Sequence, residues 1–299
     1  MLVFCSALSG AGATTTALNV AHRLAHYGEA LVLDCDLTGA GATAIAQRAA
    51  ASHEIRGLSD VLQDGVYLSP GALLDRALHL RAGGSGERAC PKSLWIIPGR
   101  SPDNGTLADE LVGGPRPNPS LGAGLVERND ASRRVEELLS ILIDWSSWSD
   151  DERWVVIDVP AHPFVAPLIV RTVARVFTET SGDAVTFSRV RHLVLGCFAW
   201  NVEQLSQARR LTRLARGHAD SFDVLCTRGA VAGGRAPTAV DLRRALHHGH
   251  GARPAPPIIP FVPVLLERSR IVETGQAPPG DRLAEAYDAL VAWIRALDT

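Results

Sequence analysis

Short apolar runs alternate with helical patterns along the first part of the chain. The run Leu2–Cys5 is followed by a helical pattern over Ala17–Ala25 and by a second apolar run, Ala30–Asp34, that closes on a carboxylate. Unbroken apolar strands are typical of parallel sheets that are covered on both faces. Strand, helix and strand within about 35 residues form the unit of doubly wound sheets. The pattern predicts an α/β fold: a doubly wound, mostly parallel sheet with helices on both faces.

The same alternation continues to the end of the chain. It predicts further strands at 94–97, 154–158, 192–198 and 221–226, and helices at 132–145, 202–216 and 281–297. The last helix has one apolar face and more acidic than basic residues, so it is expected to pack on the sheet rather than on an anionic membrane. We expect one domain over residues 1–299, with a flexible loop in the Pro/Gly-rich stretch 113–124.

The turn between the first strand and the first helix carries the main chemical signal. Gly10 and Gly12 lie just before the helical pattern, so loop N–H groups and the positive end of the helix dipole converge there on one anion. A phosphate loop of the form G-x-x-x-x-G-K-[ST] has a lysine before its hydroxyl. Here Ala13 precedes Thr14. The sequence predicts an anion-binding loop that lacks the lysine.

A structural explanation of the same turn stays open. The two glycines could only allow the helix to pack close to the strand, and Thr14 to Thr16 could only cap the helix. The carboxylates at strand ends favour a site instead. Asp34, Asp36 and Asp158 follow predicted parallel strands, and ligands of such sheets bind beyond the carboxyl ends.

The loop resembles that of a known family. Residues Leu8-Ser9-Gly10-Ala11-Gly12-Ala13-Thr14-Thr15-Thr16 are similar to the deviant K-G-G-x-G-K-T-T-T loop of the MinD/ParA ATPases. Leu8 stands where the family has the lysine that crosses to a partner subunit's nucleotide, and Ala13 where it has the lysine that grips the outer phosphates. The strand ending at Asp158 resembles the family's Walker B strand.

The resemblance implies a site for ATP or ADP with Mg²⁺. The implied nucleotide-binding residues are Gly10, Ala11, Gly12, Ala13, Thr14, Thr15, Thr227 and Pro260. Thr227 stands where a family asparagine reads the adenine edge, and Pro260 belongs to an element that walls the adenine pocket. Thr14 and Asp158 are the implied Mg²⁺ residues, the latter acting directly or through water. Asp36 is the residue that would position the attacking water.

The loss of both lysines bears on activity. Removing a preorganised donor to the transferring phosphoryl group costs on the order of a hundredfold to a thousandfold in rate. We therefore predict a pseudo-ATPase that binds nucleotide and acts as a spatial organiser or regulatory partner, similar at branch level to the CpaE/TadZ group. It would pair with itself or with a related ATPase, and with proteins of a positioning or secretion system. The alternatives are an active ParA-type ATPase that partitions DNA or cargo, and a nucleotide-free scaffold for an active paralogue in secretion or pilus assembly.

Charge and cysteine content limit the classes of partner and of metal site that we expect for this chain. The net charge of −2 gives no overall attraction to DNA or acidic membranes. Arg209, Arg210, Arg213 and Arg216 form a basic helix face that could contact DNA or simply be solvated. Five scattered cysteines without a C-x-x-C pair argue against disulfides and cysteine-bound metal. We see no signal peptide or membrane-spanning run, and we expect a cytoplasmic protein.

Overall fold

The computed structural model describes residues 1–6, 10–35, 42–43, 58, 77–79, 93–99, 133, 136–146, 152–159, 161, 165–179, 192–215, 222–228, 237–246, 256–259 and 282–297. The strands within these ranges form one sheet in the order β3-β4-β2-β5-β1-β6-β7. Their bounds are β1 Leu2–Ser6, β2 Glu29–Asp34, β3 Leu78–His79, β4 Ser93–Ile97, β5 Arg153–Val159, β6 Leu193–Ala199 and β7 Phe222–Arg228. All pair in parallel except β3, which runs antiparallel to β4 at one edge. The predicted doubly wound, mostly parallel sheet is confirmed.

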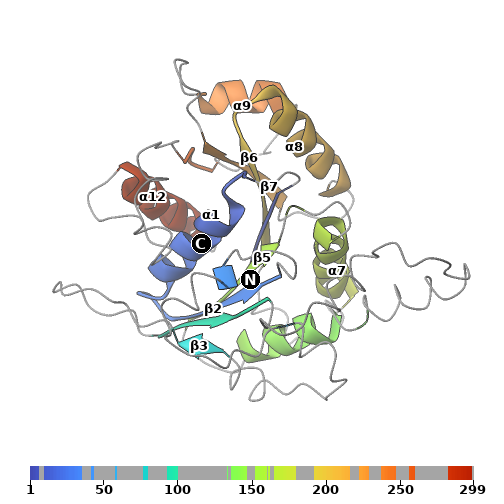
Figure 1. The fold of residues 1–299 in the computed structure, drawn as a ribbon, viewed down its shortest axis with the longest axis vertical. Coiled ribbons are helices and arrows are strands. Elements are labelled where there is room, and N and C mark those ends of the chain that lie inside the picture. The colour runs from blue at the N-terminus through green and yellow to red at the C-terminus, as the bar shows by residue number, and fades with distance from the viewer. Residues whose placement is uncertain are drawn as a thin grey trace, which may run out of the picture.

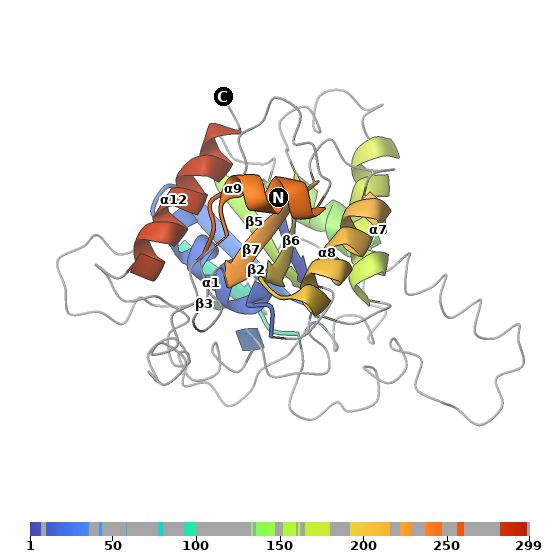
Figure 2. The same cartoon turned by 90° about the horizontal axis from the view of Figure 1, so that it is seen from above.

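Helices cover both faces of this sheet. Their bounds are α1 Ala13–Leu24, α7 Val165–Glu179, α8 Val202–Ala215, α9 Ala239–Leu246 and α12 Arg282–Ala296, and residues 136–146 are also helical. α1 and α12 lie on one side of the sheet and α7 on the other, as Figures 1 and 2 show. The sequence analysis had not predicted α7, α9 or β3.

The winding reverses direction in the middle of the sheet. β1 lies between β5 and β6, and α1 leads from it toward β2 on one side. α7 follows β5, covers the opposite face and leads toward β6 on the other side. Right-handed crossovers that run in opposite directions must cover opposite faces. Ligands of doubly wound sheets bind at the carboxyl ends of the strands where the winding reverses.

The core is divided between the two faces by the alternation of side chains along each strand. Phe4 and Val32 pack in the cluster that contains α1 and α12, whereas Val3 and Leu31 pack in the cluster that contains α7 and residues 136–146. All four side chains are buried. A third cluster lies between α8 and the strands β6 and β7, the latter at the edge of the sheet. Burial on both faces explains why these strands carry almost no polar positions.

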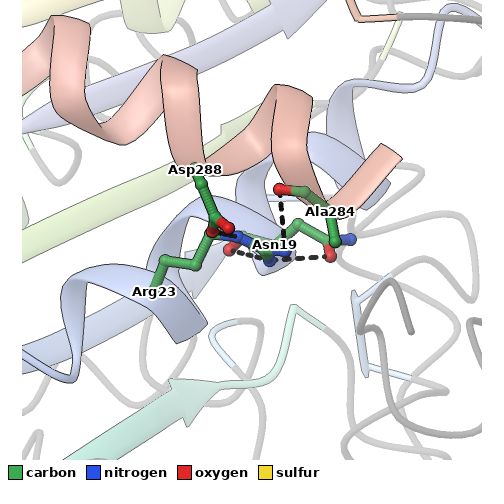
Figure 3. A network of polar contacts seen from close by, with 4 residues as sticks. All are labelled: Asn19, Arg23, Ala284 and Asp288. Carbon is green, nitrogen blue, oxygen red and sulfur yellow. Dashed lines mark hydrogen bonds and ion pairs between the residues drawn. The ribbon is translucent and has the colours of Figure 1, made fainter. Parts of the chain in front are cut away.

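The last helix packs against the first. The apolar face of α12 is buried in the same cluster as α1, through Leu283, Ala284, Tyr287, Leu290, Val291 and Ile294. A polar seam runs beside it, in which Arg23 Nε lies 2.6 Å from an Asp288 carboxylate oxygen (Figure 3). The prediction that this helix packs on the protein body is confirmed.

Among the described residues, no helix is long and apolar enough to cross a membrane. The loop predicted at 113–124 lies outside the described ranges.

Candidate functional site

The turn between β1 and α1 has the backbone geometry of an anion cradle. Gly10 and Gly12 have φ values of +76° and +81°, in the left-handed region that favours glycine. Gly12 is the N-cap of α1. The first intrahelical hydrogen bond runs from the Thr16 N–H to the Gly12 carbonyl oxygen at 2.9 Å. The N–H groups ahead of Thr16 therefore have no acceptor within the helix. The positive end of the dipole is added to them, so the turn favours a bound anion.

The threonines after the turn do not act as caps. The cap position belongs to Gly12, and no side chain within the described part of the chain caps α1 through a hydrogen bond. Thr14 and Thr15 are partly exposed, whereas Thr16 is buried with its hydroxyl 3.5 Å from the Tyr287 hydroxyl. This argues against a capping role for Thr14 and Thr15, which lie partly exposed in the first turn of α1.

The lysine position is filled by a small apolar side chain. Ala13 is 7% exposed and packs in the core cluster beneath α1. The chain has a single lysine, Lys92, which immediately precedes Ser93, the first residue of β4. The amino ends of parallel strands lie at the edge of the sheet opposite the turn. The described residues thus offer no lysine to an anion bound at Gly12.

Two carboxylates lie side by side under the turn. Asp34 on β2 and Asp158 on β5 are register partners, and Phe4 on β1 is the neighbour of Asp158 on its other side. Both aspartates are buried, at 0% and 1% exposed. By the alternation along their strands, they face the same side of the sheet as α1. Asp158 therefore lies near the carboxyl end of β5 on that face, and its role toward Mg²⁺ stays a prediction.

Asp34 has a structural partner that the sequence did not reveal. One of its carboxylate oxygens accepts from the Thr43 N–H at 2.7 Å and from the Thr43 hydroxyl at 2.6 Å. The Thr43 hydroxyl in turn accepts from the Gly99 N–H at 2.8 Å. This network fixes residue 43 against the ends of β2 and β4. The only sequence signal for it was a carboxylate at a strand end.

Thr227 contacts the turn from the far side. It lies near the end of β7, and its hydroxyl donates to the Ala11 carbonyl. The predicted residues Gly10, Ala11, Gly12, Ala13, Thr14, Thr15, Asp158 and Thr227 therefore gather at the carboxyl edge of the sheet. Asp36 and Pro260 lie outside the described residues. The neighbour of Pro260, Ile259, runs beside β7, with its N–H donating to the Cys226 carbonyl at 2.9 Å.

The thiols near this edge are not poised for chemistry. Burial raises the pKa of Cys5 to about 12 and raises the pKa of Cys197 well above its usual value, with smaller effects from Cys5 and Asp158. The described residues contain no cluster of three or more side chains of the kinds that hold a metal ion.

The arginine face predicted on α8 is only partly described. Arg210 is exposed and Arg209 is half-buried, while the side chains of Arg213 and Arg216 lie outside the description.

Several solved structures have a fold similar to that of this chain. The sequence matches no protein-family model and no curated protein. The structure is similar to a ParA family ATPase from Chlorobium tepidum TLS (15% identity, 98% of this chain and 97% of that chain, TM-score 0.58). It is also similar to the septum site-determining protein MinD complexed with Mg-ADP from Pyrococcus horikoshii OT3 (15%, 99% and 96%, 0.60). A third similar structure is the MinC:MinD cell division protein complex from Aquifex aeolicus (17%, 99% and 95%, 0.59). The MinD/ParA-like resemblance is confirmed at the level of the fold, over nearly the whole chain.

Proposed function

We propose that this protein is a MinD/ParA-like nucleotide-binding protein with a degenerate site, which works as a spatial organiser or regulatory partner rather than as an efficient ATPase. One observation carries the proposal. The anion cradle at the start of α1 keeps both left-handed glycines, while buried Ala13 fills the position of the phosphate-gripping lysine. The backbone N–H groups and the helix dipole bind phosphate without a lysine, so weakened binding can persist where efficient hydrolysis is lost.

The oxygen donors present fit a hard cation bound together with phosphates. Mg²⁺ is commonly held by one or two carboxylates, hydroxyls, water and phosphate oxygens. Thr14 in the first turn of α1 and Asp158 near the end of β5 are the residues that would hold it, and the N–H groups from Gly10 to Thr15 would bind the phosphates. When bound, Mg²⁺ would neutralise part of the phosphate charge, a task that falls to it and to the helix dipole here because the lysine is missing.

Slow hydrolysis follows from the same residues. A lysine in the loop stabilises charge that develops on the transferring phosphoryl group, and its loss typically costs on the order of a hundredfold to a thousandfold in rate. The predicted water-positioning residue Asp36 cannot compensate for this, because it acts on the nucleophile and not on that charge. Bound ATP would therefore persist as a signal rather than be consumed quickly.

The proposed partners follow the relatives. Because one similar structure is a MinC:MinD complex, we propose that this chain also acts through protein partners, as a homodimer or as a heterodimer with a related ATPase. A positioning or secretion system is the proposed setting. The cytoplasm is the proposed location.

Calorimetric titration of Mg-ATP and Mg-ADP into the full chain tests the proposal. We expect micromolar binding that is lost in Thr14→Ala and in Gly12→Arg, which places a side chain at φ +81°. Ser206→Ala is the matched control, because it removes an exposed hydroxyl on α8, away from the turn. No binding at millimolar nucleotide would refute nucleotide binding and favour the nucleotide-free scaffold.

Phosphate release separates the proposal from an active ATPase. We expect little Mg²⁺-dependent release from the wild-type chain. Rapid release that Asp36→Ala abolishes would overturn the pseudo-ATPase and favour a partitioning ATPase.

A further inference from the structure

Thr227 occupies an irregular point of β7. Phe198 pairs with Cys226 and Ala199 pairs with Arg228, so Thr227 is one extra residue of β7 opposite two consecutive residues of β6. Bulges are common beside functional sites. Leu225, two residues earlier on β7, packs in the cluster that contains α1, so the alternation along β7 directs the Thr227 side chain to the same face of the sheet.

The Thr227 side chain contacts two consecutive residues of the anion-binding turn. Its hydroxyl donates to the Ala11 carbonyl, with the Phe198 carbonyl oxygen as a second acceptor at 3.2 Å. A Cβ added at Gly12 would lie 3.6 Å from both Cβ and Oγ1 of Thr227, which is ordinary van der Waals contact. Thr227 is 5% exposed. Thus a buried threonine near the end of β7 contacts the turn and hydrogen-bonds to it.

We infer that Thr227 is a positioning residue of the anion-binding turn and not a contact to the base. A threonine hydroxyl has one proton to donate, and both nearby acceptors are main-chain carbonyls. The peptide unit is planar and trans, so a carbonyl of Ala11 that points to β7 turns the Gly12 N–H away from β7. Thr227 thereby fixes the direction in which the Gly12 N–H of the cradle is presented.

The positioning role depends on the threonine that this chain has at position 227. An asparagine, the residue type that the family resemblance would place at this position, would present an amide group there instead of a single hydroxyl. The inference rests on the proposed function for its ligand. The contact itself can be measured without any ligand, so the two can fail separately.

The first experiment is hydrogen exchange, read by mass spectrometry, on the full chain without nucleotide. Loss of one hydrogen bond in Thr227→Val should speed exchange in the first turn of α1, beginning at Thr16, by about threefold to tenfold. Thr227→Ser keeps the hydroxyl and should restore the wild-type rate. Exchange in α7 serves as the internal control for folding. If Val proves globally unstable, Thr227→Ala against Thr227→Ser makes the same comparison. Equal first-turn rates in all variants would overturn the inference.

The second experiment separates the phosphate side from the base side. Mg-pyrophosphate and adenosine are titrated separately into the wild-type chain, Thr227→Val and Thr227→Ser. We expect Val to weaken pyrophosphate binding by about threefold to tenfold, with adenosine unchanged and Ser close to wild type. Weaker adenosine binding with unchanged pyrophosphate binding would overturn the inference in favour of a base contact. If neither probe binds the wild-type chain while the exchange result holds, the proposed function fails and the positioning role stands.

Discussion

Removing the guanidinium of Arg23 should destabilise the protein far more than removing its ion-pair partner. The guanidinium donates to the Asn19 carbonyl and side-chain oxygens, each at 3.2 Å, and to the Ala284 carbonyl at 3.3 Å. It also lies 5.4 Å from the centre of the Tyr287 ring. The contacts with Asn19 lie within α1, whereas those with Ala284, Tyr287 and Asp288 join α1 to α12; Figure 3 shows the polar ones.

The expected magnitudes follow from burial. The Arg23 side chain is 13% exposed, whereas that of Asp288 is 67% exposed. An exposed ion pair contributes about 0.2–1 kcal/mol, so Asp288→Ala should cost no more than that. Arg23→Met keeps the apolar stem but leaves partly buried carbonyls without their donor and removes a cation–π contact of about 0.5–1 kcal/mol. We expect a total loss of about 2–4 kcal/mol for Arg23→Met.

Urea unfolding of the two single variants and the double variant measures both costs and their coupling. The coupling energy should be below about 1 kcal/mol and should shrink as salt is added, because Asp288 is solvated. Two spectroscopic probes with coincident transitions would license the two-state analysis. An Asp288→Ala cost equal to that of Arg23→Met, with coupling as large as either, would refute the reasoning, since the ion pair would then account for the whole effect.

Three further predictions concern the turn, the sheet edge and acid stability. Ala13→Lys should tighten Mg-ATP binding about tenfold by calorimetry, because it returns a cation to the cradle, and unchanged affinity would argue against phosphate at the turn. Gly28→Ala should lower the free energy of unfolding in urea by more than about 2 kcal/mol, because the new Cβ would lie 1.8 Å from the Glu152 carbonyl oxygen. Gly10→Ala is the comparison variant. Nothing lies within 4 Å of its new Cβ, so it reports the cost of backbone conformation alone. Burial, with smaller effects from His26 and Arg23, lowers the pKa of His22 to about 4. The unfolded chain therefore takes up this proton first, and stability should fall from about pH 6.5 to about pH 4, a slope that His22→Phe should reduce in unfolding measured across that range.

The sheet could be predicted from the sequence because burial on both faces leaves an unmistakable apolar run. The strands ending at Asp34 and Asp158 were placed to within a residue or two, and the glycine turn was recognised from its position between strand and helix. The helix α7 was missed although its signal was present, in the spacing of Ile169, Val173 and Val176 along one face.

Other features had no local signal. β3 is two residues long and is defined only by its pairing with β4. Thr43 and Asp34 are nine residues apart, and their contact depends on the path of the chain between them, which neither residue type predicts. The bulge at Thr227 is a property of the register between two strands, so the residue could be assigned to a strand end but its direction could not be read. Details of the site that depend on strand register cannot be predicted from a single sequence.

The central place of β1 has a consequence for how the protein is made. The strand Leu2–Ser6 hydrogen-bonds to β5 and β6, the nearer of which begins at Arg153. A ribosome adds about 5–20 residues per second, so a growing chain carries this apolar segment for roughly 8–30 s before its first neighbour exists. The apolar face of α1 waits longer still, until α12 has left the exit tunnel. Translation therefore passes through a long interval in which this apolar strand has neither of its partners, and we expect chaperones that bind nascent chains to act there.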